Sequence, residues 1–134
     1  ISKLFEIEKT VKEKHLGEFN HVNNVQYLFW VQEIAEAHWR KLIQNKNISI
    51  KGSWIVRSHK IEYKNFTNLN DNIIISTYVK NAQGFLSERV ITMKLKNSKK
   101  ILVKCLTKWC FVELNTLKLK KIPQEIIRLL NNKD

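Results

Sequence analysis

The order of the expected secondary-structure elements constrains this chain more than any other feature of its sequence. One long helix, predicted over residues 24–44, is followed by residues 53–112, in which only strand-like patterns occur. Strands that follow one another without intervening helices pair antiparallel, because a parallel pair needs a long crossover connection. This order excludes a doubly wound α/β fold.

The long helix has a recognisable start and one continuous face of apolar and aromatic side chains. Asn23 is a favourable N-cap residue, and Gln26 three positions later makes the start similar to a capping box. Further apolar residues in the first turns, including Phe29, predict that this end is buried on more than one side. The side chains that recur at spacings of three and four, and so share one stripe, are Tyr27, Val31, Ile34, Ala35, His38, Trp39 and Leu42.

Strands are predicted on both sides of this helix. An alternating pattern predicts the first strand over residues 3–11, followed by a polar loop through Asn20. Turn-like breaks at residues 81–84 and 96–99 indicate hairpins, and Pro123 opens a short helix predicted over residues 123–130. Four further strands are predicted at residues 53–63, 73–79, 85–95 and 101–112.

The economical arrangement of these elements is an α+β fold in which an antiparallel sheet wraps around the one long helix. The free edges of such a sheet commonly pair with a second subunit. The 134 residues, of which 43% are hydrophobic, suit a single domain over residues 1–134 without a linker or repeat.

Apolar runs and cysteines indicate where such a chain resides. No apolar run approaches the roughly 20 residues that span a bilayer, and the N-terminal stretch lacks the apolar centre of a secretory signal. Cys105 and Cys110 would lie about 16 Å apart on one extended strand, too far for a disulfide. We therefore expect a soluble cytoplasmic protein with reduced thiols and no membrane span.

The net charge of +12 predicts attraction to polyanions such as nucleic acid, an anionic membrane, an acidic carrier protein or a phosphate-rich cofactor. Much of this charge is Lys spread over turns and strand faces, so it does not define a site. We expect no nucleic-acid partner, because the sequence lacks a helix-turn-helix, a zinc-finger spacing and an aromatic RNA-binding motif. The His, Asn and Glu residues also lack the spacing of a metal site.

One segment carries a specific resemblance to a known family. From Asn20 to Tyr27 the sequence reads Asn-His-Val-Asn-Asn-Val-Gln-Tyr, directly at the predicted helix start. This segment resembles the His-Val-Asn-Asn-x-x-Tyr signature of the hot-dog thioesterases, such as 4-hydroxybenzoyl-CoA thioesterase. Other features stand in the order that this family shows, so that the resemblance covers most of the chain: Ile61 to Tyr63, Asp71, Thr77, Trp109, Ile122 and Pro123.

The resemblance implies the hot-dog fold and the hydrolysis of acyl thioesters to a free acid and a thiol. The implied partner is acyl-CoA or acyl carrier protein, and CoA or phosphopantetheine is then part of the substrate rather than a cofactor. In this family the thioester carbonyl lies near the start of the central helix, often at a dimer interface, so we expect a homo-oligomer. Free N–H groups at a helix N-terminus can stabilise the developing oxyanion, and here these would be the amides of residues 24–26.

The resemblance also implies roles for individual residues. His21 and Asn24 would orient water or hydrogen-bond the carbonyl, and Tyr27 and Trp30 would line the acyl pocket. As an alternative, the two asparagines are simply good helix-start residues and the tryptophans are core. The remaining motif positions complete the expected substrate-binding set: Asn20, Asn23 and Val25.

A basic strand segment contains Arg57, Lys60 and Lys64, which could bind the phosphates of CoA or an acidic carrier protein. A solvated strand edge explains these three residues equally well.

The chain departs from the family pattern at the residue that should activate the chemistry. Many members carry an acidic residue four positions before the motif His, and Gly17 occupies that position here. Glu18, its neighbour, or Glu33 on the helix could supply the carboxylate instead. The alternative hypothesis is therefore a hot-dog protein that binds acyl thioesters or a partner without turning them over.

Overall fold

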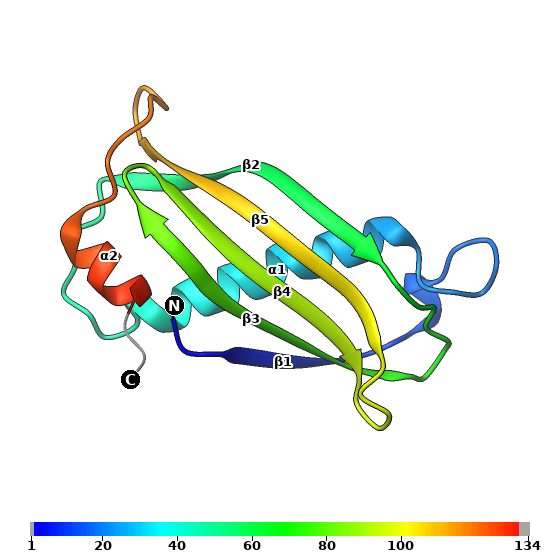
Figure 1. Cartoon of the computed structure of the whole chain (residues 1–134). Coiled ribbons are helices and arrows are strands. Elements are labelled where there is room, and N and C mark those ends of the chain that lie inside the picture. The colour runs from blue at the N-terminus through cyan, green and yellow to red at the C-terminus, as the bar shows by residue number, and fades with distance from the viewer. Residues whose placement is uncertain (1, 132–134) are drawn as a thin grey trace.

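The computed structural model describes residues 2–131 and contains one antiparallel sheet, one long helix and a short C-terminal helix. The sheet has the strand order β1-β3-β4-β5-β2 and curves around α1, which lies behind it in Figure 1. This is the hot-dog arrangement that was predicted. The elements are β1 (Phe5–Thr10), the short 3₁₀ helix η1 (Glu13–His15), α1 (Asn24–Ile43), β2 (Gly52–Tyr63), β3 (Asn72–Gln83), β4 (Leu86–Leu95), β5 (Ile101–Glu113) and α2 (Gln124–Asn131).

The predicted elements are all present, and the main difference in their bounds concerns the β3–β4 hairpin. β3 continues to Gln83, through most of the break predicted at residues 81–84. A register shift between Val79 and Asn81 keeps the strand paired with β4 as it approaches the turn. Within residues 81–84, only Gly84 takes a positive φ, 61°, and a glycine adopts that conformation without steric cost.

The core consists of two apolar clusters, one under each half of α1. The cluster under the first half is built from Trp30, Val31 and Ile34 of the helix against inward-facing side chains of the strands. The cluster under the second half includes Phe111 of β5 and Ile126 of α2. α2 therefore closes the end of the sheet that lies opposite the loop before α1 (Figure 1).

A belt of polar side chains lies on the inner face of the sheet between these clusters. The Nη1 atom of Arg89 hydrogen-bonds His38 Nδ1 of α1 at 2.7 Å and Thr77 Oγ1 of β3 at 3.1 Å. Thr107 Oγ1 of β5 hydrogen-bonds His59 Nδ1 of β2 at 2.8 Å. Arg89, Thr107 and His59 are cross-strand neighbours on β4, β5 and β2. We call these five residues the polar belt.

The start of α1 is less buried than the sequence indicated. Phe29 is 62% exposed and Val25 is 55% exposed. The prediction that this end is buried on more than one side is wrong for this chain, because the sheet covers only one side of the helix. The asparagine cap at Asn23 is confirmed.

Both cysteines, Cys105 and Cys110, are buried and free. In the part of the chain that the structure describes, we find no helix that is both long and apolar enough to cross a membrane.

Candidate active site

Among the amides of residues 24–26 at the start of α1, one is a free backbone donor. The side-chain Oδ1 of Asn23 accepts a hydrogen bond from the Val25 N–H at 2.9 Å, and the Asn23 carbonyl accepts one from the Gln26 N–H at 2.9 Å. The Asn24 N–H has no hydrogen-bond partner among residues 2–131. Of the amides predicted to meet an oxyanion, Asn24 is therefore the one not engaged in the helix cap.

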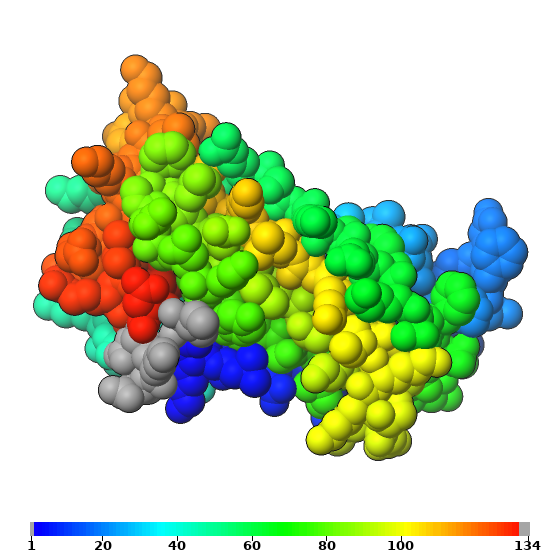
Figure 2. All heavy atoms as spheres, in the orientation of Figure 1, coloured from blue at the N-terminus to red at the C-terminus, as the bar shows by residue number. Residues whose placement is uncertain are grey.

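His21 lies immediately before this turn, in a loop that projects from one end of the molecule (Figure 2). Its ring stacks on Phe66, with centroids 4.6 Å apart and planes 16° apart. Its carbonyl accepts a hydrogen bond from the Gly17 N–H at 2.8 Å, which closes the loop. The Nδ1 atom of His21 is buried without a hydrogen-bond partner among the described residues. Such unpaired polar atoms are uncommon in folded proteins and call for an explanation, of which a catalytic role is one.

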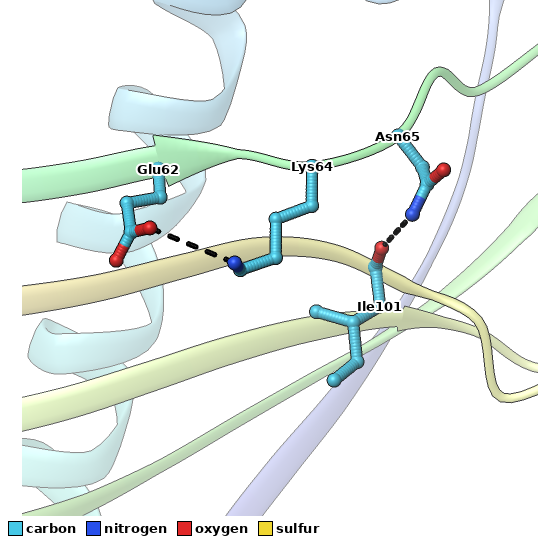
Figure 3. A network of polar contacts seen from close by, with 4 residues as sticks. All are labelled: Glu62, Lys64, Asn65 and Ile101. Atoms are coloured by element: carbon cyan, nitrogen blue, oxygen red, sulfur yellow. Dashed lines mark hydrogen bonds and ion pairs between the residues drawn. The ribbon is translucent and has the colours of Figure 1, made fainter.

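The segment that carries Phe66 is fixed to the start of β5. The backbone N–H groups of Lys64 and Asn65 both donate to the Leu102 carbonyl, at 2.7 and 3.3 Å. The Asn65 side chain donates to the Ile101 carbonyl at 2.6 Å, beside an ion pair between Lys64 and Glu62 at 3.6 Å (Figure 3). These contacts hold the segment after β2 in place beneath the loop before α1.

Two tyrosines join this segment to α1. The Tyr27 hydroxyl and Thr67 Oγ1 are 2.5 Å apart, and the Tyr63 hydroxyl donates to the Asn24 carbonyl at 3.3 Å. Burial raises the pKa of Tyr27, so its hydroxyl stays neutral at physiological pH. Trp30 is buried, with 2% of the residue exposed, and its ring makes edge contacts to His15 and Tyr27. Trp30 is thus a core residue in this structure, as the alternative interpretation of the tryptophans predicted.

The two candidate acids lie in different surroundings. Glu18 is exposed in the same loop as His21. Glu33 forms an ion pair with Lys9 of β1 and lies nine residues, or about 13 Å, along the helix from Asn24. The structure does not bring Glu33 together with His21.

Gly17 leaves space for a side chain at the position where the family carries its acid. A Cβ added there would lie 3.6 Å from Asn23 Cβ and 3.7 Å from the His21 carbonyl oxygen, which are ordinary contacts. A carboxylate at this position would therefore start beside two residues of the motif, and its absence is not forced by the backbone.

The other predicted substrate contacts are exposed and spread over the same end and edge of the molecule. Asn20 takes a positive φ, 58°, at the tip of the loop. Lys60 precedes Tyr63 on β2 by three residues, or about 10 Å. Arg57 lies at a register shift between Val56 and Ser58, farther along the strand.

A cavity that was not predicted lies under the second half of α1. It has a volume of about 270 Å³ and lies 11 to 15 helix residues beyond Asn24, or about 16–22 Å. The signal for it was present in the sequence, because Arg89 occupies an inward position of β4 and is followed at the next inward positions by the apolar Ile91 and Met93. Its lining residues include Ala35, Glu36, Trp39, Ser53, Trp54, Ser87, Arg89 and Trp109. Within residues 2–131, no group of three or more His, Cys, Asp or Glu side chains is placed to hold a metal ion.

The fold is shared with solved structures, among them proteins named as thioesterases. A Staphylococcus aureus protein solved in complex with CoA matches with a TM-score of 0.83 at 13% identity, over 100% of this chain and 88% of that chain. The probable thioesterase YbaW from Escherichia coli matches with a TM-score of 0.77 at 21% identity, over 93% and 95% of the two chains. At these identities the likeness defines the class of fold, which is the hot-dog fold.

A third structure, the 12:0-ACP thioesterase from Umbellularia californica, matches with a TM-score of 0.81 at 15% identity. The match covers 95% of this chain and 49% of that one, so this chain spans about half the length of the plant enzyme. A search of curated proteins by sequence found no match.

The family model of the acyl-ACP thioesterase N-terminal domain matches residues 5–130. The chain therefore belongs to the acyl-ACP thioesterase family. The predicted family resemblance and the predicted reaction class, hydrolysis of acyl thioesters, are confirmed at this level.

Proposed function

We propose that the chain hydrolyses acyl thioesters at the start of α1. The observation that carries this proposal is the N–H of Asn24, which has no partner among residues 2–131 and lies at the N-terminus of a 20-residue helix. A donor at the positive end of a helix dipole stabilises the negative charge that develops on the thioester oxygen. His21 lies three residues before this donor and carries a buried nitrogen that no other described residue contacts by a hydrogen bond.

The reaction needs one proton acceptor and one proton donor. A water molecule attacks the thioester carbonyl carbon and gives a proton to the base, while the oxyanion accepts a hydrogen bond from the Asn24 N–H. The C–S bond then breaks, the thiolate takes up the proton, and the acid is released. Glu18 is the carboxylate that fits the role of base, because Glu33 is distant and paired with Lys9. His21 and the Asn24 side chain would position the water and the carbonyl.

The carrier would be CoA or acyl carrier protein, and its thiol arm would be part of the substrate, with no separate cofactor. The net charge of +12 favours both carriers, since one bears phosphates and the other is acidic. Arg57 and Lys60 are exposed on β2, the strand that ends at the site. Two buried free cysteines fit a reducing compartment, and we infer a cytoplasmic location.

We further propose that the chain forms a homo-oligomer through β2. This strand pairs with β5 on one side and forms the edge of the sheet on the other. The exposed side chains of Val25 and Phe29 lie at the same end of the molecule as the site. Light scattering coupled to size-exclusion chromatography gives the mass, and a monomer at the working concentration contradicts the proposal.

The test of hydrolysis is thiol release from short, medium, long and aromatic acyl-CoA and acyl-ACP substrates. We expect His21→Ala and Glu18→Gln to lower kcat by about 100-fold, as general acid–base catalysis of this kind contributes. Glu33→Gln is the matched control, because it removes an equivalent carboxylate remote from the site. Loss of activity in Glu33→Gln and not in Glu18→Gln would contradict the assignment. If the protein binds acyl thioesters but hydrolyses none of them, the proposal of hydrolysis is contradicted and the non-catalytic binding protein is favoured.

A further inference from the structure

The cavity under the second half of α1 has the form of a small-molecule site. It lies between α1 and the start of β2, and Ser87, Arg89 and Trp109 line it from the sheet. Trp39 of α1 and Trp54 of β2 add aromatic surface. Its volume of about 270 Å³ is close to the lower end, roughly 300 Å³, of known ligand sites. A ligand for this cavity would therefore be small and partly apolar.

Arg89 brings a buried positive charge to this cavity. The residue is only 5% exposed, and both of its hydrogen bonds to described side chains use Nη1. A guanidinium carries five N–H donors, so most of its hydrogen-bonding capacity is not used by these two partners. The partners are also uncharged, because burial and the charge of Arg89 lower the pKa of His38 to about 4.

The described residues provide no counter-charge for Arg89. Within residues 2–131 no carboxylate forms an ion pair with it. Of the acidic side chains that the structure describes, Glu36 alone lines the cavity, and it is exposed. A buried cation without an anion is unfavourable, and a bound anion would remove that cost.

Trp109 lines the same cavity and carries a second buried donor. Its indole Nε1 is buried and has no hydrogen-bond partner among the described residues. Trp109 is the cross-strand neighbour of Ser87, two pairs along from Arg89 and Thr107 and therefore on the same face of the sheet. The guanidinium, the indole N–H and the Ser87 hydroxyl are thus gathered on the inner face of two adjacent strands.

We propose that this cavity binds a small carboxylate, whose oxygens accept hydrogen bonds from Arg89 and whose apolar body lies against Trp39 and Trp54. A carboxylate accepts hydrogen bonds without donating any, and its two oxygens match the fork of a guanidinium. The site lies about 16–22 Å along the helix from Asn24 and does not depend on the hydrolysis proposed there.

The first experiment compares ligands that differ only in charge. Benzoate, benzamide and benzyl alcohol are titrated into the wild-type protein, and so are hexanoate and hexanamide. Three of the four tryptophans line the cavity, so binding changes the intrinsic fluorescence, and calorimetry gives Kd independently. We expect saturable binding of the carboxylates, with the amides and the alcohol at least about 10-fold weaker. Equal affinity for benzoate and benzamide, or no binding of either carboxylate, overturns the proposal.

The second experiment tests Arg89 with a matched surface variant. Arg89→Met should weaken benzoate binding by about 10- to 100-fold, while Arg57→Met, which removes an exposed Arg of β2, leaves it unchanged. Arg89→Lys keeps the charge and should bind benzoate more tightly than Arg89→Met. Circular dichroism and a thermal melt establish whether each variant is folded. If Arg89→Met does not fold, the comparison of carboxylates with amides on the wild-type protein decides the proposal. An equal loss in both Met variants shows that net charge alone attracts the ligand.

Two further arms identify the source of the carboxylate. If it is the acid released by thioester hydrolysis, that acid inhibits turnover in wild type and not in Arg89→Met. If it is the far end of an acyl group, thioesters with a terminal carboxylate are hydrolysed faster than unsubstituted ones, and Arg89→Met removes the preference. Binding of free benzoate does not require turnover, so failure of the hydrolysis proposal leaves this test intact.

Discussion

The two halves of α1 face different interiors. The first half packs Trp30, Val31 and Ile34 into a continuous apolar cluster. Its candidate functional residues lie beyond this cluster, in the preceding loop and the first turn of the helix. The second half faces the polar belt and a cavity, with His38 buried against Arg89. One helix thus supports chemistry at an exposed end and recognition in a buried pocket, and each half should respond to a different kind of change.

Glycines near the two halves give the sharpest contrast. A Cβ on Gly52, which lines the cavity, would lie 2.7 Å from the Val112 carbonyl oxygen and closer still to the Phe111 ring. We expect Gly52→Ala to lower the free energy of unfolding by about 2–3 kcal/mol, measured by urea denaturation. Gly17→Ala is the control and should change it by less than about 0.5 kcal/mol, since its Cβ meets only ordinary contacts. Similar losses of unfolding free energy in Gly52→Ala and Gly17→Ala would show that the two positions do not differ in packing.

The stability of the second half should depend on pH. Burial and the charge of Arg89 lower the pKa of His38 from 6.5 to about 4. The unfolded chain therefore binds more protons than the folded chain between these values, so stability is present above about pH 6.5 and is lost as pH falls towards 4. We expect a loss of about 2 kcal/mol after solvent screening.

The control for this pH dependence is His38→Gln, which should flatten the curve of unfolding free energy against pH. A smaller slope should remain, because burial also lowers the pKa of His15 and His59. An unchanged slope in the variant would assign the effect to other groups.

The first half should respond to chemistry rather than to packing. Gly17→Asp restores an acid beside Asn23 and His21, and we expect kcat/KM for thioester hydrolysis to rise about 10-fold, or about 1.4 kcal/mol. Gly17→Asn has nearly the same shape without the charge and should give no increase. A rise in both variants would indicate a structural effect of the loop.

The smallest effect is expected at Glu33. Its ion pair with Lys9 is partly exposed, so Glu33→Gln should change the free energy of unfolding by less than about 0.5 kcal/mol. Thermal denaturation with and without 0.5 M salt checks this, and a larger change would show that β1 depends on this pair.

The sequence predicted the fold well because its order of elements and its periodicities are local signals. The alternation that ends at Tyr63 and the cap at Asn23 both appear at the predicted places. The exposure of Phe29 was not predicted, because an apolar residue looks the same in sequence whether or not a neighbour covers it.

The part of the site that was predicted from the sequence also depends on local signals. His21 and Asn24 are three residues apart, so one motif places both at the helix start. Phe66, which stacks on His21, is brought there by the pairing of β2 with β5, a contact between distant parts of the chain. Arg89 and His38 are 51 residues apart, and only the folded sheet brings them together.

The register shift at Arg57 has a consequence for self-association. A bulge bends and twists an edge strand, so a second strand cannot continue a straight ladder past it. Residues 58–63 and residues 52–56 therefore offer two short templates instead of one of 12 residues. The charge on Arg57 further disfavours edge-to-edge pairing of β2 strands from many chains. A paired edge between a few subunits is compatible with this interruption, whereas an open-ended fibre is opposed by it.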